Sequence, residues 1–402
     1  MVGDRKGKPF RTSARQSRKQ IAALLRDSWR SMKRLANIVI VFLAAFSLAA
    51  SANDGVFYAQ GNNLVPLQET RVELRKELLQ FYVRDFEFMD VVVDFEFFNP
   101  DGERRLTVGF VSPPAMGDVE EEGGHPQISD FTVEVNGQRL AYKVTKMSET
   151  SFATSNNSFD DWDYVYHFDV TFRPGVNRVK HTYRFRGGSS VETQRDFHYQ
   201  ITTGKRWANG KIGDFELQMH LDEGIYYVPA SFEKAGAPAK WEIVGSGVIK
   251  PGSETILGYE DETFKMVHLN RGYLRLKEKA FEPDYEISLG EFNWVAGWAG
   301  KMCKTGSDCI SESERERISM YFSLRPGQWA DAEALEVLND RERRILRNFG
   351  FALRGYEFKD SELRSYFSKF FWYKPESSVT AESVELNEVE KEFIAKLGAS
   401  TK

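Results

Sequence analysis

The longest part of the chain alternates apolar and polar residues with a period of two. The clearest run, Val91–Phe98 (VVVDFEFF), is followed by the turn Asn99–Gly102 (NPDG) and by the second run Arg105–Val111. A strand that is buried on one face shows this alternation, and a Pro-Asp-Gly turn between two such runs is typical of a β-hairpin. We therefore predict a hairpin here.

Two more segments repeat this pattern. Asp130–Val144 reverses at Asn136-Gly137, and Asp163–Phe185 reverses at Pro174-Gly175. Strict alternation indicates strands with one buried and one hydrated face, as in antiparallel sandwiches. We predict a mainly β region over residues 53–290, an antiparallel β-sandwich of Ig-like proportions that forms either one large or two small sandwiches.

Helical periodicity appears once before residue 300 and again near the C-terminus. Thr70–Phe81 places Val72, Leu74, Leu78 and Leu79 at helical spacing, which predicts a helix.

The C-terminal pattern predicts three helices. The first lies within Asp331–Phe349, the second is capped by Asp360-Ser361, and the third, Leu386–Leu397, begins with Asn387 and Glu390 in a capping box. We therefore predict a small all-α domain over 326–402, joined to the β region by a junction over 291–325.

Aromatic residues crowd the stretch Phe349–Pro375 (FGFALRGYEFKDSELRSYFSKFFWYKP). Such a stretch could bind nucleic acid, bind a membrane surface, form a catalytic site or form the core of a small domain. The rings recur at helical spacing, and small domains need many large apolar groups to be stable. We therefore interpret them as core residues.

The N-terminus predicts export. Residues 1–34 are basic, Leu35–Ala52 carry no charge, and the small residues Ala50-Ser51-Ala52 precede Asn53. This is typical of a signal peptide, which we place at 1–52 with cleavage between Ala52 and Asn53. The long basic segment leaves the start codon open between Met1 and Met32, and the alternative is an uncleaved membrane anchor.

The charge of the chain and its predicted export limit the classes of possible binding partner. The formal net charge is −5, and removal of the basic leader makes the mature chain more acidic. An acidic chain repels phosphate backbones, which excludes nucleic acid. We expect an envelope glycan or protein as partner, and a membrane only if the leader is uncleaved.

The two cysteines predict a disulfide. Cys303 and Cys309 flank the turn-forming residues Thr305–Asp308, and an exported protein permits the bond. A metal site is disfavoured because no His or second cysteine pair lies nearby, and the spacing is not that of C-x-x-C redox proteins.

The best binding candidate is the loop Thr203–Trp207. Lys205 and Arg206 could pair with an anion, and Trp207 could stack on a sugar ring. The alternative is a hairpin turn whose Trp folds over the sheet edge.

The oxygen-rich run Asn156–Tyr164 (NNSFDDWDY) could bind calcium through Asp160, Asp161 and Asp163. It lacks the EF-hand spacing, and a solvated loop is the favoured interpretation. The run Asp118–Glu122 is interpreted as a flexible acidic loop. We therefore expect no metal and no cofactor.

No catalytic motif of the serine-hydrolase, zinc-peptidase or P-loop kind is present, and the six His residues are scattered singly, five of them in strand-like segments. We therefore expect no enzymatic activity. A pair of carboxylates acting as in glycosidases remains open, because sequence alone does not give their separation.

The C-terminal region resembles the YARHG domain, a small module of exported bacterial proteins. The match runs from Leu346 to about Leu397, and Phe351-Ala352-Leu353-Arg354-Gly355 stands where the family has Y-A-R-H-G. The other matching positions are Arg347, Asn348, Tyr356, Phe358, Leu363, Tyr366, Phe367, Trp372, Tyr373, Pro375 and the acidic Glu390.

This resemblance implies no assigned activity. The family's Arg and His are replaced by Leu353 and Arg354, and Gly355 is expected to end the first helix in a left-handed cap. The β region is similar to an exported bacterial family of unknown function, which includes the segment Tyr199–Leu221.

Together these features predict an exported envelope protein that binds a glycan, peptidoglycan or protein without catalysis. The alternatives are a carboxylate-dependent wall hydrolase and a signal-anchored assembly factor.

Overall fold

The structure is a computed structural model, and it describes residues 60–62, 64–66, 70–84, 88–112, 124–150, 163–188, 193–234, 236–256, 261–292, 301–304, 309–311, 335–336 and 338–399. The chain divides into the units Met1–Gly55 and Val56–Lys402, and every described residue belongs to the second. The predicted signal peptide with its cleavage point Ala52/Asn53, the acidic loop Asp118–Glu122 and most of the calcium candidate lie outside the described residues.

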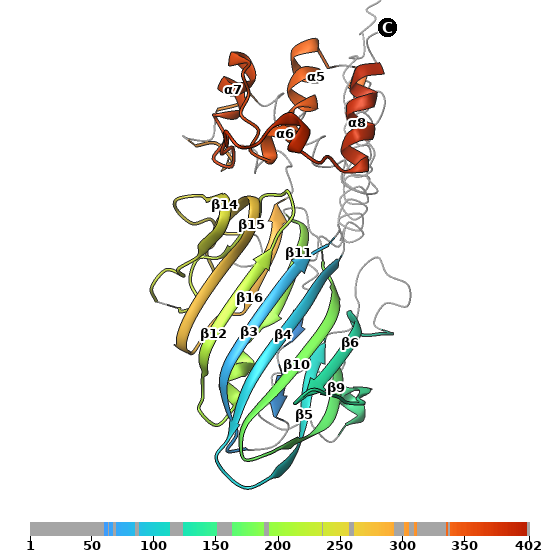
Figure 1. Cartoon of the computed structure of the whole chain (residues 1–402), viewed down its shortest axis with the longest axis vertical. Coiled ribbons are helices and arrows are strands. Elements are labelled where there is room, and N and C mark those ends of the chain that lie inside the picture. Colours follow the sequence, from blue (N-terminus) through green and yellow to red (C-terminus); the bar gives the residue numbers. More distant parts are fainter. Residues whose placement is uncertain are drawn as a thin grey trace, which may run out of the picture. The chain divides into compact units, whose positions relative to one another are not determined.

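Two β-sheets form the region between residues 60 and 292 (Figure 1). The larger sheet has twelve strands in the order β1 (Gln60–Asn62), β11 (Thr193–Gln200), β16 (Ile287–Phe292), β13 (Tyr226–Pro229), β15 (Phe264–Phe281), β12 (Ile212–His220), β3 (Glu73–Val83), β4 (Phe88–Asn99), β10 (Gly175–Arg186), β6 (Ile128–Val135) and β7 (Gln138–Arg139), with β14 (Glu242–Ile249) also paired to β15. The smaller sheet has the order β2 (Leu64–Pro66), β5 (Arg104–Ser112), β9 (Tyr164–Phe172) and β8 (Lys143–Lys146). The predicted mainly β region is confirmed.

The two sheets share one apolar core. In β4 every second side chain is buried, from Met89 to Phe97, as the alternation requires. Phe95 and Phe97 of the larger sheet belong to the same buried cluster as Phe110 and Phe172 of the smaller sheet. This face-to-face burial is the sandwich that the sequence predicts. Two strand pairs depart from the antiparallel pattern, because β3 with β12 and β1 with β11 are parallel.

Two of the three predicted hairpins are wrong in their pairing. The turn after β4 and the turn at Pro174-Gly175 both lead from one sheet to the other, since β4 pairs with β3 and β10 whereas β5 pairs with β9. Asn99 fixes this crossing by donating hydrogen bonds from Nδ2 to the carbonyl oxygens of Gly102 (2.9 Å) and Phe172 (3.1 Å). Alternation identifies the buried face of a strand and does not identify its neighbour.

The third predicted turn is confirmed. Val135 pairs with Gln138 across Asn136-Gly137, and both turn residues have positive φ, 50° and 82°. That backbone is the two-residue hairpin turn that Asn-Gly favours.

The predicted helix at Thr70–Phe81 is wrong, because Glu73–Val83 is strand β3. A β-bulge between Leu74 and Lys76 interrupts the register with β4. The buried positions are therefore Leu74, Glu77, Leu79 and Phe81, and the three-residue step across the bulge imitates helical spacing.

The C-terminal region is helical, as predicted, but its described part has four α-helices rather than three, because Phe349–Leu353 forms a separate short helix, α6. It contains α5 (Asp340–Arg347), α6 (Phe349–Leu353), α7 (Ser361–Phe367) and α8 (Glu388–Ala399), with the short 3-10 helix η3 (Ala381–Ser383). The other 3-10 helices are η1 (Met147–Glu149) and η2 (Ile201–Arg206).

The expected helix caps are present. Asp360 accepts a hydrogen bond from the backbone of Leu363 (2.9 Å), and Asn387 and Glu390 form the reciprocal capping box at the start of α8. Gly355 has a φ of 78°, and Tyr356 N–H donates to the carbonyl of Phe351, which makes the left-handed end of α6.

The aromatic stretch forms a second core, which confirms its interpretation as core. Phe349, Phe367, Phe370 and Trp372 are buried. They share a cluster with Tyr227, Phe264, Met266 and Phe292 of strands β13, β15 and β16. The helices therefore pack on the larger sheet, on the face opposite to the sandwich core.

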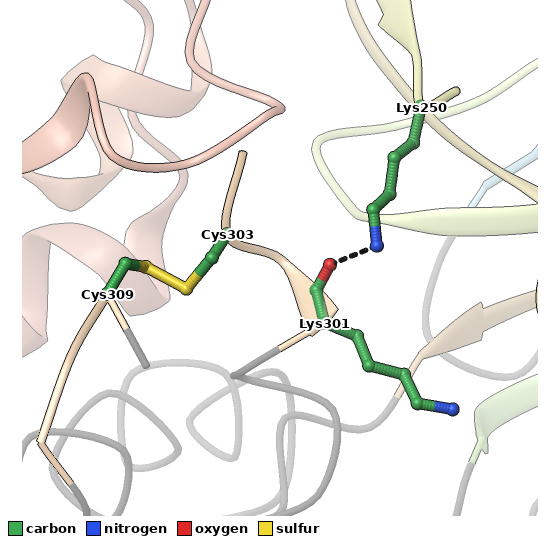
Figure 2. The surroundings of a disulfide bond; sticks show 4 residues. All are labelled: Lys250, Lys301, Cys303 and Cys309. Carbon is green, nitrogen blue, oxygen red and sulfur yellow. Dashed lines mark hydrogen bonds between the residues drawn. A yellow bond between two sulfur atoms is a disulfide. The ribbon is translucent and has the colours of Figure 1, made fainter. Parts of the chain in front are cut away.

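The predicted disulfide joins Cys303 and Cys309, whose Cα atoms are 5.9 Å apart (Figure 2). Next to it, the backbone N–H of Lys304 donates to the carbonyl of Lys369 (2.8 Å) and that of Phe371 to the carbonyl of Met302 (2.9 Å). Lys250, just after β14, donates from Nζ to the carbonyl of Lys301 at 2.5 Å (Figure 2). The disulfide segment thus links the aromatic stretch to the sheet.

His181 lies in the sandwich core inside a cage of aromatic rings. The centroids of the rings of Phe95, Phe131 and Phe168 are 5.3–5.8 Å from its own. Neither ring nitrogen has a hydrogen-bond partner among the described residues, and burial lowers the pKa of His181 from 6.5 to about 3.

We predict that this residue makes the fold sensitive to acid. Below pH 6.5 the unfolded chain gains a proton at residue 181, whereas the native chain does not. The contribution of His181 to the free energy of unfolding is therefore complete above pH 6.5 and is lost as the pH falls toward about 3. The slope approaches about 1.4 kcal/mol per pH unit. Urea unfolding of wild type and H181L between pH 7 and pH 4.5 should show a smaller loss in the variant; an equal loss in both would contradict this.

Candidate functional site

The predicted ligand loop lies at η2, and its tryptophan is not available to a ligand. Trp207 is 2% exposed, and its ring centroid is 4.2 Å from that of Phe97. The indole is therefore part of the sandwich core. Lys205 Nζ lies 3.7 Å from Asp284 Oδ1, and burial lowers the pKa of Arg206. The stacking on a sugar that we expected of Trp207 lacks an exposed ring.

Two half-buried carboxyl groups lie beside this loop. Glu286 accepts hydrogen bonds from the backbone N–H (3.0 Å) and the hydroxyl (2.5 Å) of Thr202. Burial raises the pKa of Glu286 and also that of Glu262, where repulsion from Glu286 adds to the effect. A raised carboxyl pKa is a property that a general acid needs.

A Ser, a His and an Asp are hydrogen-bonded in a row on strands β11 and β16. Ser288 Oγ lies 3.2 Å from His198 Nδ1, and His198 Nε2 lies 3.1 Å from Asp196 Oδ1. The three are only 2%, 5% and 1% exposed, respectively. The ring nitrogens are also used in the opposite sense to the usual serine-hydrolase triad. Because the hydroxyl is buried, we interpret the row as a structural network.

Tyr227 completes this network from β13. Its hydroxyl donates to Asp196 Oδ1 at 2.5 Å. The ring lies across Gly290, where a Cβ would be only 2.3 Å from a ring carbon of Tyr227. Any side chain at position 290 would displace the tyrosine, so the glycine is required for the carboxylate to keep this partner.

A second buried network occupies the opposite face of the same strands. Arg195 donates from Nε to Glu291 (2.9 Å) and from Nη2 to both oxygens of Asp222 (2.8 Å each). The same Nη2 lies 2.7 Å from the hydroxyl of Tyr226. A buried charge needs such compensation. Sequence reasoning missed both networks, since their members are far apart in the chain.

The outer face of the larger sheet carries rows of alternating charge. Strands β10, β4, β3, β12 and β15 are neighbours in this sheet (Figure 1). Their registers place the residues that do not face the core opposite one another. One row contains Arg178, Glu96, Lys76, Asp214 and Lys279. The next contains Lys180, Asp94, Leu78, Glu216 and Lys277.

Two adjoining depressions lie on these rows. Their volumes are about 330 and 580 Å³, and Asp94 and Arg178 line both. At one end of the first row, Lys279 forms an ion pair with Asp214, with Nζ 2.6 Å from Oδ2. Within the described residues, no ion pair involves Arg178, Glu96 or Lys76. These three side chains are therefore available to a polar ligand.

Aromatic rings lie on the same face at its other end. The rings of Tyr82 and His220 are stacked with centroids 4.4 Å apart, and the Tyr273 ring is 4.9 Å from His220. Burial, with a contribution from Arg84, lowers the pKa of His220, so this imidazole is neutral at pH 7. Next to it, Gln80 donates to Gln218 at 3.0 Å. We name this polar face, from Arg178 to Tyr273, the outer face.

The signature turn of the helical domain is a structural junction. Arg354 donates from its two Nη atoms to the two oxygens of Glu390 (2.9 Å each) and lies 3.0 Å from Glu223 of the β region. The carbonyl of Leu353 lies 2.7 Å from Nε2 of His268 on β15, whose Nδ1 is 2.8 Å from the carbonyl of Gly224. The two positions that depart from the family pattern thus connect α6 to α8 and to the sheet.

In the parts of the chain that the structure describes, no group of three or more His, Cys, Asp or Glu is arranged to hold a metal ion. Within the same residues, no helix is both long and apolar enough to cross a membrane.

The pair Arg354–Glu390 should stabilise the helical domain. R354M removes the guanidinium and leaves the carboxylate of Glu390 half-buried, which should lower the free energy of unfolding by about 2 kcal/mol. R364M, on the exposed side of α7, is the matched control and should change little. Urea unfolding measures the free energy of unfolding of both variants. The double variant R354M/E390Q should lose less free energy of unfolding than the sum of the losses in R354M and E390Q. Equal stability of R354M and R364M would contradict the prediction.

Comparison with known proteins gives one match in sequence and several in structure. The sequence model of the YARHG domain matches residues 324–401. No curated protein matches the chain. A crystal structure of a candidate nutrient binding protein from Legionella pneumophila is 17% identical, with a TM-score of 0.48, over 86% of this chain and 99% of that chain.

Peptidases match more weakly. The M1 zinc metallopeptidase of Deinococcus radiodurans is 13% identical with a TM-score of 0.25, over 55% of this chain and 42% of that one. The leukotriene A4 hydrolase of Saccharomyces cerevisiae is 7% identical with a TM-score of 0.25, over 56% of this chain and 29% of that one. The sequence match therefore assigns residues 324–401 to the YARHG domain.

Proposed function

We propose that this protein is exported to the bacterial cell envelope and binds a glycan, a peptidoglycan fragment or another protein there without catalysis. The observation that carries the proposal is the outer face, where Arg178, Glu96 and Lys76 lie in two adjoining depressions without ion-pair partners among the described residues.

The outer face is suited to a ligand that carries both carboxylate and amino or hydroxyl groups. Arg178 and Lys76 lie on either side of Glu96, each on a strand about 4.8 Å from the strand of Glu96. Two cations with a carboxylate between them match a zwitterionic ligand better than a purely anionic one. The ion pairs nearby, such as Lys277–Glu216, are exposed and cost little to exchange for contacts with a ligand.

Export is supported by three independent features of the chain. The basic segment and the uncharged segment Leu35–Ala52 are typical of a signal peptide. The disulfide Cys303–Cys309 is a bond that oxidising compartments maintain. The YARHG domain is a module of exported proteins.

The YARHG domain acts in this proposal as a cover for the sheet. Its aromatic side chains share a core with β13, β15 and β16, and the outer face remains open elsewhere. Lys205 and Arg206 remain candidates for contact with an anion, without a contribution from Trp207.

Charge reversal on the outer face should weaken binding. The double variant K76E/R178E should bind muropeptides or envelope glycans at least about tenfold more weakly than the wild type, because it turns both cations of the depression into anions. K240E, an exposed lysine elsewhere, is the control. Isothermal titration of the purified mature chain with muropeptides, run beside a glycan array and a pull-down from envelope extract, measures this. If the wild type binds nothing in all three measurements, or if K76E/R178E binds as tightly as the wild type, the proposal is overturned.

Cleavage of the leader should give a mature chain that begins at Asn53. Mass spectrometry of the native protein, recovered from fractionated cells, should find that N-terminus in the periplasmic or extracellular fraction. A chain that retains Leu35–Ala52 in the membrane fraction would instead favour the anchored assembly factor.

A further inference from the structure

We propose that the open edge of strand β8 is a docking site for an extended segment of another protein, one in which apolar and acidic side chains alternate. β8 (Lys143–Lys146) ends the smaller sheet and pairs with β9 on one side, Lys143 with His167 through Lys146 with Tyr164. No described strand lies on its other side. In a paired strand every second residue directs its N–H and C=O away from the partner, so this edge offers hydrogen bonds that an added strand can complete.

The apolar side chains at this edge are unusually exposed. Among the described residues only three large hydrophobic side chains are exposed: Tyr142 (38%), Val144 (43%) and Val176 (51%). Two of these three lie at this edge, two residues apart. They project on the same side of the strand.

The exposed tyrosine is held in place by the core. The Tyr142 ring centroid is 4.9 Å from that of Phe131 and 5.7 Å from that of Tyr166. The exposed part of the ring therefore extends the sandwich core to the surface at its open edge. An added strand would continue that core at little cost in side-chain entropy, because the ring is already positioned.

The charge at the edge selects acidic side chains. Lys143 lies on the side of the strand opposite to Tyr142 and Val144, where the acidic side chains of an alternating peptide would lie, and it forms no ion pair with a described residue. Lys146 lies on the apolar side, and its Nζ is 5.6 Å from the centre of the Tyr164 ring. The pKa of His167, next to Lys143, is lowered by burial and by that lysine, so the histidine adds no positive charge at pH 7.

These features favour an extended peptide over the other possible occupants. A sugar does not complete the hydrogen bonds of a strand edge in register, whereas a peptide backbone does. A second copy of β8 would bring the lysines of both copies together, and like charges opposite one another are destabilising. The site lies on the smaller sheet, so it is independent of the outer face and of the ligand proposed there.

The test uses the full mature chain and a fluorescein-labelled synthetic peptide of about eight residues in which Val and Glu alternate, a length typical of a strand. Fluorescence anisotropy measures binding to wild type, V144E and K143E. V176E is the matched control, since it changes a valine that is at least as exposed but lies outside this edge. A second peptide, in which Lys replaces Glu, tests the charge selection.

V144E and K143E should each bind the Val-Glu peptide at least about tenfold more weakly than wild type, V176E should bind as wild type does, and the Val-Lys peptide should bind at least about tenfold more weakly. No binding to wild type, equal loss in V176E, or equal affinity for both peptides would overturn the proposal. So would a dimer of the wild-type chain in light scattering that V144E dissociates, because a second copy would then occupy the edge. Loss of muropeptide binding at the outer face does not bear on this result.

Discussion

Burial on both faces of β13, β16 and the first part of β15 (Phe264–Leu269) is the constraint on which the rest of the structure depends. Tyr226, Val228, Ile287 and Leu289 face the sandwich core. The alternate residues of the same strands, such as Tyr227 and Phe292, face the helices. A strand with two buried faces has no hydrated side on which to place polar groups, so every polar residue in it needs a partner inside the protein.

The two buried networks meet this requirement. Glu291 faces the sandwich side and is compensated by Arg195, whereas Ser288 faces the helical side and is hydrogen-bonded to His198. Tyr227 reaches Asp196 only because residue 290 is a glycine. A row of Ser, His and Asp is here a means of burying polar residues.

The YARHG domain is the element that covers the helical side. Its signature turn contacts the sheet through the carbonyl of Leu353 and through Arg354, and the disulfide segment pairs with its aromatic stretch. Without this cover, Phe264, Met266 and Phe292 would lie on the surface. The polar outer face and the edge of β8 lie where this cover does not reach, which leaves them open to partners.

Much of the architecture could be predicted from local patterns. The period of two identified strands such as β4, β5, β6, β9 and β10, though not β3. The Asn-Gly turn and the three helix caps were recognisable from residues four or fewer positions apart, and the short spacing of Cys303 and Cys309 indicated the disulfide. These features depend on backbone geometry and on neighbours in sequence, which a sequence contains directly.

Partners across the fold were decided only by the tertiary structure. The bulge at Leu74–Lys76 made a strand resemble a helix, and the strands on either side of Pro174-Gly175 belong to different sheets. Trp207, which the sequence made a candidate for stacking on sugars, is a core residue, and the rows of charge from Arg178 to Lys279 come from five strands. The sequence by itself determined which side chains each strand would bury; only the packing of distant strands decided what they meet, because the free energy of burial depends on the partner and not on its distance along the chain.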